Sequence, residues 1–205
     1  LALEGGFTLA SSGDGAFSLN SAIAMTLQPA LIDGYQIMLR SQIDYEAAAK
    51  AANGDAKSFG LATKYLVGNM IRSMSKRMEI EFLYGQSGLG IIESVNPSSG
   101  TAAIVISEAS FADAIFAGST NYEFDVWNDA ASGTSTQRNT NAAVVLASFD
   151  PDTRTLNVTG NATDMSALQV GDYIFYRGAK SGTSPNVVYK EMAGINKILS
   201  TTSGS

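Results

Sequence analysis

The sequence predicts a mixed α+β fold, in which one long helix packs on an antiparallel sheet. Apolar residues recur three or four positions apart from Lys57 to Tyr84, which indicates an amphipathic helix. From Ile91 to Tyr176 the pattern changes to short apolar runs separated by turn residues, which is typical of strands. With 205 residues, 45% of them hydrophobic, the chain can bury a core as one large domain or as a domain with an insertion.

Residues 1–33 are predicted to form an N-terminal arm. Its first 30 residues carry only two charged residues, Glu4 and Asp14, and glycine groups divide their apolar residues into short stretches. Such spacing favours short strands or an extended arm over a stable helix. An arm of this kind can pack on a neighbouring subunit as easily as on its own body.

Residues 34–57 are predicted to form an extended excursion that leads into the helix. From Leu39 to Tyr45, apolar or small residues alternate with Arg, Gln and Asp, so a strand is expected from Tyr35 to Tyr45. A projection with mixed charges on both sides buries little within its own subunit. It therefore needs a partner surface, or it stays mobile.

Residues 58–93 are predicted to hold the long helix and the glycine turn that ends it. About 28 helical residues span roughly 40 Å, so the helix would serve as a spine. Gly85 is expected to stop the helix, and Gly88 and Gly90 to prevent it from resuming. The expected core positions of this spine are Phe59, Leu66, Met70, Met74 and Met78. Its expected charged positions are Arg72, Lys76, Arg77 and Glu79.

Charge is divided unevenly between this helix and the rest of the chain. Residues 57–84 carry five basic and two acidic side chains, whereas the remaining residues carry eight basic and seventeen acidic ones. A basic helix in an acidic protein indicates contact with acidic neighbours, its own or those of another subunit. Binding to a phosphate backbone is the alternative, although aromatic residues do not interleave with the basic ones.

Residues 94–176 are predicted to be rich in strands. A compact antiparallel sheet or a small barrel is expected, because turn signals such as Asn96-Pro97 and Asp150-Pro151 separate the apolar runs. A short helix is expected at 108–117, a polar loop at 128–141, and helix-like spacing follows at 187–199. The six predicted strands are 91–95, 102–106, 124–127, 142–148, 154–158 and 172–176.

The residue types argue against an enzyme. The chain has no histidine and no cysteine, which excludes Ser-His and Cys-His nucleophiles, disulfides and ordinary zinc sites. Glu79 and Glu81 are two positions apart on a helix and therefore diverge. Asp150 and Asp152 fit a plain turn better than a loop for a hard cation. We therefore predict no catalytic residue, no metal site and no cofactor.

Two further classes of partner are disfavoured. The net charge of −6 leaves no broad basic footprint for nucleic acid. No apolar run approaches the roughly 18 residues of a membrane span, so no membrane partner is expected. Because the sequence begins with Leu1 and ends in a loop-like Thr-Thr-Ser-Gly-Ser, we expect it to be part of a longer chain.

The order of these parts resembles the major capsid protein family of tailed bacteriophages. The resemblance depends on Phe59 at the helix start, on Lys-Arg-Met-Glu at 76–79, and on the glycine-rich helix end at 83–90. A second match is Val-Gly-Asp-Tyr-Ile-Phe at 170–175, followed by Gly-Ile at 194–195. The resemblance as a whole covers most of residues 30–95 and is weak elsewhere.

The resemblance implies a capsid fold with an N-terminal arm (1–33), an extended E-loop (34–57) and a P-domain. The P-domain would consist of the spine helix and its turn (58–93) and of strands with an inserted small β domain (94–176). Residues 177–205 would be the start of an A-domain or a return segment. The function implied is a major capsid protein that self-assembles into an icosahedral head shell around double-stranded DNA.

The same resemblance implies the partners and the location. The chain would contact copies of itself in hexamers and pentamers, together with portal, scaffold and decoration proteins and packaged DNA without sequence specificity. It would be assembled in the bacterial host cytoplasm and reside in the virion. Each exposed ion pair between subunits would contribute on the order of 0–1 kcal/mol. The E-loop side chains expected to form such pairs are Arg40, Asp44, Glu46 and Lys50.

Two other functions remain open. A phage tail, baseplate or surface protein that binds a receptor is one alternative, although no repeat or heptad supplies a trimeric stalk. A hydrolase of sugars is the other, and it would need two carboxylic acids about 5–10 Å apart in a cleft.

Overall fold

The computed structural model describes residues 34–41, 56–119 and 121–200, and for 56–62 it describes the backbone alone. The chain divides into two units, Leu1–Gly34 and Tyr35–Ser205. Gly34 is the described residue of the first unit, so the predicted arm at 1–33 lies outside the described residues.

In the described part of the second unit, a long helix is followed by short strands and helices. The long helix, α2, spans Ala56–Tyr84, so the prediction of a helix at 57–84 is confirmed. The six predicted strands are also confirmed, within a few residues at their ends. They are β1 (Gly90–Ser98), β2 (Thr101–Ile106), β3 (Glu123–Trp127), β4 (Val144–Asp150), β5 (Thr155–Thr159) and β6 (Tyr173–Tyr176). The shorter elements are η1 (Glu108–Ser110), α3 (Asp113–Phe116), α4 (Ala162–Ala167), β7 (Lys180–Ser181), β8 (Val188–Tyr189) and α5 (Ile195–Ser200).

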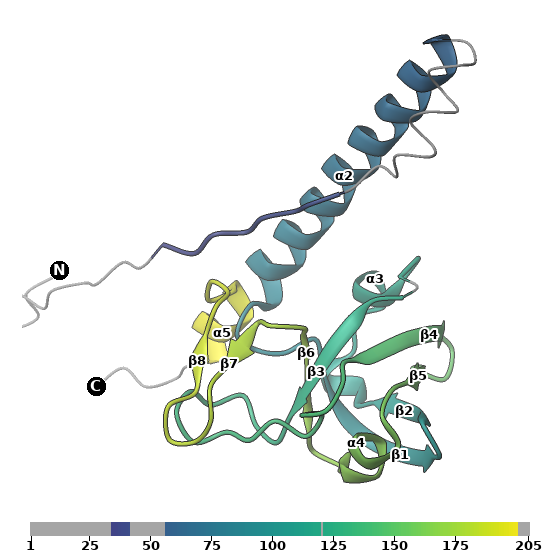
Figure 1. Cartoon of the computed structure of the whole chain (residues 1–205). Coiled ribbons are helices and arrows are strands. Elements are labelled where there is room, and N and C mark those ends of the chain that lie inside the picture. The colour runs from purple at the N-terminus through teal and green to yellow at the C-terminus, as the bar shows by residue number, and fades with distance from the viewer. Residues whose placement is uncertain (1–33, 42–55, 120, 201–205) are drawn as a thin grey trace, which may run out of the picture. The chain divides into compact units, whose positions relative to one another are not determined.

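The six strands close into an antiparallel barrel in the order β1-β2-β5-β4-β3-β6 (Figure 1). The ring is completed where β1 pairs with β6, with Gly90 opposite Ile174 and Ile91 opposite Tyr173. A closed barrel leaves no unpaired edge around its ring. Of the two arrangements expected for these strands, a sheet or a small barrel, the structure has the barrel.

The predicted capsid fold, with a long spine helix packed on an antiparallel sheet, is therefore wrong. Closure turns the apolar side chains of the strands toward one another, so no open sheet face remains on which a spine helix could lie. The expected inserted β domain is also not separate from the rest, because all six strands from Gly90 to Tyr176 belong to one barrel. Among the helices and strands, α2 packs mainly against the short helix α5.

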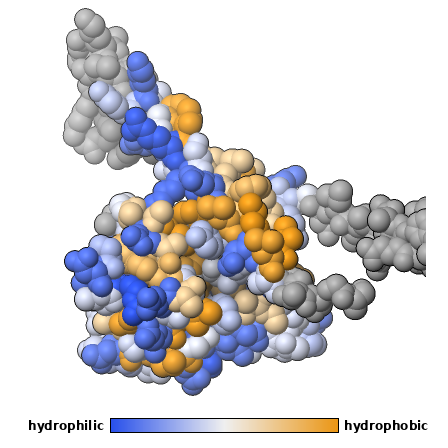
Figure 2. Space-filling model, turned by 180° about the vertical axis from the view of Figure 1, so that it is seen from behind, coloured by the Kyte–Doolittle hydropathy of each residue, from blue (hydrophilic) through white to orange (hydrophobic). Residues whose placement is uncertain are grey.

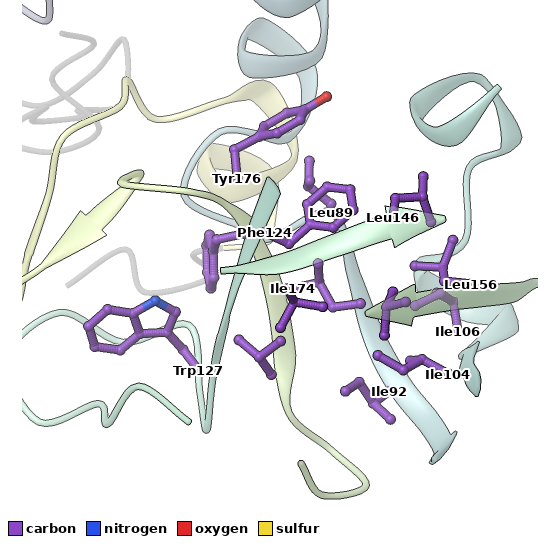
Figure 3. Packing of buried hydrophobic residues seen from close by; sticks show 14 of the residues in the cluster. Leu89, Ile92, Ile104, Ile106, Phe124, Trp127, Leu146, Leu156, Ile174 and Tyr176 are labelled. Carbon is purple, nitrogen blue, oxygen red and sulfur yellow. The ribbon is translucent and has the colours of Figure 1, made fainter. Parts of the chain in front are cut away.

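The barrel interior is a continuous apolar core. In β2, buried Ala102, Ile104 and Ile106 alternate with more exposed residues, as expected for a strand with one face inside. Figure 3 shows side chains from all six strands gathered in this interior. Full burial of each large apolar side chain contributes roughly 1.5–3 kcal/mol. The core thus accounts for the short, regularly spaced apolar runs of the sequence.

Two local predictions differ from the structure, and one short helix was not predicted. The described part of the predicted strand at 35–45, residues 35–41, has no regular secondary structure, because alternation alone does not supply a pairing partner. Of the segment with helix-like spacing, 187–199, only the last part forms a helix, α5. Its first part contains the strand β8, which pairs with β7. The helix α4 was not predicted, although Asn161 caps it by accepting a hydrogen bond from the Thr163 N–H at 2.9 Å.

Candidate assembly interface

The last turns of α2 are attached to the barrel by specific polar contacts. The Lys76 ammonium donates to the carbonyl oxygen of Ala117 at 2.8 Å and to the Ser119 hydroxyl at 3.2 Å. One turn later, Ile80 is buried in the apolar core with 7% of its surface exposed. From Lys76 onward, α2 is therefore held on the barrel by its side chains.

Arg77 is the central side chain of this attachment. Its Nε donates to Glu81 Oε1 at 2.7 Å, and its Nη2 lies 3.8 Å from a carboxylate oxygen of Glu191. Its guanidinium carbon is 3.5 Å from the ring centroid of Tyr176, at the end of β6. This geometry permits cation–π stacking in addition to the ion pairs. One cation thereby links α2, β6 and the segment that follows β8.

The carboxylates around Arg77 are almost fully buried. Glu81 has 4% of its surface exposed and Glu191 has 6%. Burial raises the pKa of Glu191, while a hydrogen bond from the Gln86 N–H and the charge of Arg77 act in the opposite direction. Burial also raises the pKa of Tyr176 to about 12, again opposed by Arg77. The guanidinium therefore compensates negative charge that the fold has removed from water.

The end of α2 is held by a close approach of two backbone segments. The Gly194 N–H donates to the Gly85 carbonyl oxygen at 2.8 Å. A Cβ atom at Gly194 would lie 2.5 Å from the Gly85 nitrogen, and one at Gly85 would overlap the Met192 carbonyl oxygen. Only glycine fits at either position, so the predicted role of Gly85 as a helix stop has a second, packing reason.

A groove of about 410 Å³ borders this attachment. Its walls come from α2, from the segments around Arg177 and Lys190, and from the extended residues 36–39. Arg40 follows directly in the sequence and is exposed, as a contact residue between subunits needs to be. The other three predicted E-loop contacts, Asp44, Glu46 and Lys50, lie outside the described residues.

On the side of the helix away from the attachment, α2 presents an apolar stripe to solvent. The stripe consists of Val67, Ile71, Met78 and Phe82, whose exposed fractions are 48%, 61%, 49% and 57%. At 3.6 residues per turn these four positions fall within an arc of about 60° on one side of the helix. Figure 2 shows hydrophobic surface on the side of α2 and around its junction with the barrel. An exposed apolar stripe of this kind is a candidate interaction surface.

The predicted spine core occupies a different position from the one expected. Leu66, Met70 and Met74 are half-buried, and Met78 belongs to the exposed stripe. The side chain of Phe59 lies outside the described residues. Among the described residues, the fully buried apolar side chain that α2 contributes to the core is Ile80.

The predicted spine charges divide into two pairs. Lys76 and Arg77 hold α2 on the barrel. Arg72 and Glu79 are exposed, and neither forms an ion pair with the part of the chain that the structure describes. This second pair is available to a partner.

Lys180 is a buried cation that was not singled out in the sequence. Only 2% of its surface is exposed, and its Nζ donates to the carbonyl oxygens of Asp129 at 3.0 Å and Ala131 at 2.9 Å. Burial lowers its pKa to about 8, and the charge of Asp129 opposes this shift. Three aromatic rings surround the ammonium, those of Trp127, Phe175 and Tyr189. A lysine within an otherwise ordinary polar run gives no sequence signal of such burial.

The described residues contain no group of three or more acidic side chains placed to hold a metal ion. None of the helices in this part of the chain combines the length and the apolar character of a membrane span. The chemistry that the surface does offer is apolar and ionic contact along α2. Comparison with family models, with curated proteins and with solved structures gave no match to this chain.

Proposed function

We propose that this chain is a structural protein that assembles with copies of itself, rather than an enzyme. The observation that carries the proposal is the exposed apolar stripe of α2 at Val67, Ile71, Met78 and Phe82. In water this surface is unfavourable, at roughly 25 cal/mol for each Å² of apolar area. Association removes it from water, and a rigid helix loses little conformational entropy on binding.

Charge supports a second copy as the partner. The α2 segment is basic, whereas the remainder of the chain is strongly acidic. Exposed acidic side chains of the same unit include Glu108 and Asp152. Two copies can therefore bring opposite charges together, which favours encounter and orientation of the chain with itself.

The assembly we propose is the icosahedral head shell of a tailed bacteriophage, enclosing double-stranded DNA. This part of the proposal rests on the sequence resemblance over residues 30–95 and does not depend on the capsid fold. In such a shell the chain would contact itself in hexamers and pentamers and would meet portal, scaffold and decoration proteins. An acidic shell would repel the packaged DNA, which suits a container that later releases it.

The test is the size of the native assembly, measured by sedimentation velocity over a range of concentrations and by electron microscopy. Closed shells or rings of subunits are expected. An Ile71→Asp variant should raise the concentration needed for assembly by at least about tenfold, because it places a charge in the apolar contact. The matched control is Asn69→Asp, which adds the same charge at an exposed position on another side of α2. A chain that stays monomeric at all concentrations would overturn the proposal.

A further inference from the structure

We infer that two copies of this chain meet through their α2 helices, which pack antiparallel along the exposed apolar stripe with a twofold axis beside Ser75. This inference rests on the proposed self-assembly and names one contact within it. It is carried by three features of the helix: the spacing of the stripe, the residue at its centre and the charges at its side.

The stripe has the symmetry that an antiparallel pair requires. Val67 and Phe82 are equally distant from a point between residues 74 and 75, and so are Ile71 and Met78. Two antiparallel copies aligned about this point therefore place Val67 of one helix opposite Phe82 of the other, and Ile71 opposite Met78. Each apolar side chain of the stripe then faces an apolar side chain, and none faces a charge.

The centre of the stripe permits close approach. Ser75 is exposed and small, and the helical repeat places it about 50° from the middle of the stripe. A twofold axis perpendicular to the plane of the two helices brings both copies of Ser75 to the same side of the contact. At the usual separation of packed helices, roughly 8–10 Å, their Cβ atoms are about 4–6 Å apart.

The exposed charges beside the stripe determine the direction of the two helices. Arg72 and Glu79 lie on the same side of α2, the side that also carries Ser75. In the antiparallel pair, Arg72 of each copy meets Glu79 of the other, with a difference of only about 3 Å along the helix axis. In a parallel pair these side chains would lie on opposite sides of the contact and could not meet. The charges therefore select the antiparallel arrangement.

The first experiment uses a single cysteine, because the natural sequence contains none. The full chain with Ser75→Cys is assembled and mildly oxidised, and the disulfide-linked dimer is quantified on a non-reducing gel. Rapid cross-linking between copies is expected, because the Cβ separation is near that of a disulfide. Asn69→Cys, exposed on another side of the same helix, is the matched control and should cross-link at least about tenfold more slowly.

The second experiment tests the charge pair in the Ser75→Cys background. Arg72→Glu alone and Glu79→Arg alone should each slow cross-linking by about tenfold, since each creates two contacts between like charges. The double variant R72E/E79R should restore the rate, because opposite charges again face each other. A structural defect of the helix would not be rescued by the second substitution.

The outcomes separate this inference from the proposed function. Large particles could form while the Ser75→Cys variant does not cross-link, or while the double charge reversal does not restore cross-linking. Either result would overturn the antiparallel contact without contradicting the proposed shell. Cross-linked dimers that never grow into larger particles would support the contact and overturn the shell. A monomer at all concentrations would overturn both.

Discussion

At the scale of single residues, the least expected feature is that charged side chains are placed inside the fold. Lys180 is as buried as the apolar core around it, and its ammonium donates hydrogen bonds to two backbone carbonyl oxygens. Those carbonyls belong to the polar loop after β3, so this lysine fixes a loop that has little apolar surface of its own. Burial of a charge in this way costs stability unless the charge is fully paired.

Lys180 should therefore make stability depend on pH. Its pKa is about 8 in the folded chain, below the ordinary value of 10.5, so the unfolded chain binds more protons between these two values. Stability then rises with pH across this range. The unfolding free energy of the natural chain minus that of Lys180→Met should increase by up to about 2 kcal/mol from pH 8 to pH 10.

The measurement is urea unfolding of both proteins at pH 7, 8, 9 and 10. It ends at pH 10 because burial raises the pKa values of Tyr176 and Tyr189, so that stability falls again at higher pH in both proteins. A constant difference between the two proteins would show that the Lys180 ammonium keeps its ordinary pKa in the folded chain.

At the scale of elements, the joint between α2 and the barrel decides how the helix is held. Arg77 separates the buried carboxylates of Glu81 and Glu191, and the paired glycines at 85 and 194 bring the two backbones together. Loss of one partner in such a cluster leaves a charge buried without compensation. The joint is therefore the point where a single substitution can loosen α2 while the barrel core stays intact.

We expect Arg77→Ala to lower the unfolding free energy by about 3 kcal/mol at pH 7. Glu191→Gln should cost much less, because a glutamine oxygen can still accept the hydrogen bond from the Gln86 N–H, which is 2.9 Å long. In the Glu191→Gln background, Arg77→Ala should cost at least about 1 kcal/mol less than it does alone.

Urea unfolding of the four proteins in this double-mutant cycle gives the coupling. Arg177→Ala is the matched control, because it breaks the exposed ion pair with Glu123 and should change stability only slightly. Additive effects of the two substitutions would contradict the assignment of Arg77 as the compensating cation of Glu191.

At the scale of the whole second unit, the fold combines a closed apolar core with a helix that is partly exposed. The barrel buries its apolar residues within itself, whereas α2 keeps an apolar stripe between Val67 and Phe82 in contact with water. Local stability follows buried contacts, so the two regions should open with different free energies.

Hydrogen exchange measured by mass spectrometry should show this difference. In dilute, unassembled chain, the amides of β2 and β5 should exchange slowest, and those of residues 63–75 should exchange much faster. On assembly, residues 63–75 should become protected by at least about tenfold, while the barrel changes little. Equal protection of residues 63–75 in both states would contradict the assignment of this half of α2 to the contact between copies.

Several elements could be predicted because their signals are local. The apolar repeat and the glycine end predicted α2, and the turn residues between apolar runs predicted all six strands. The candidate interface was predicted only in part. Arg72 and Glu79 were expected to be charged positions of the helix, and they are exposed. The prediction of the spine core was less accurate, because an apolar position such as Met78 looks the same in a sequence whether it faces a core or solvent.

The sequence by itself determined the type and the approximate limits of the main elements, because helix and strand periodicity, caps and turns depend on residues close together in the chain. Tertiary structure alone decided that β1 pairs with β6, that Lys180 and Glu191 are buried, and that part of the apolar surface of α2 remains uncovered. These features depend on contacts between residues far apart in the chain. A periodic pattern shows that an apolar face exists, but only the packing of the whole unit shows what covers it.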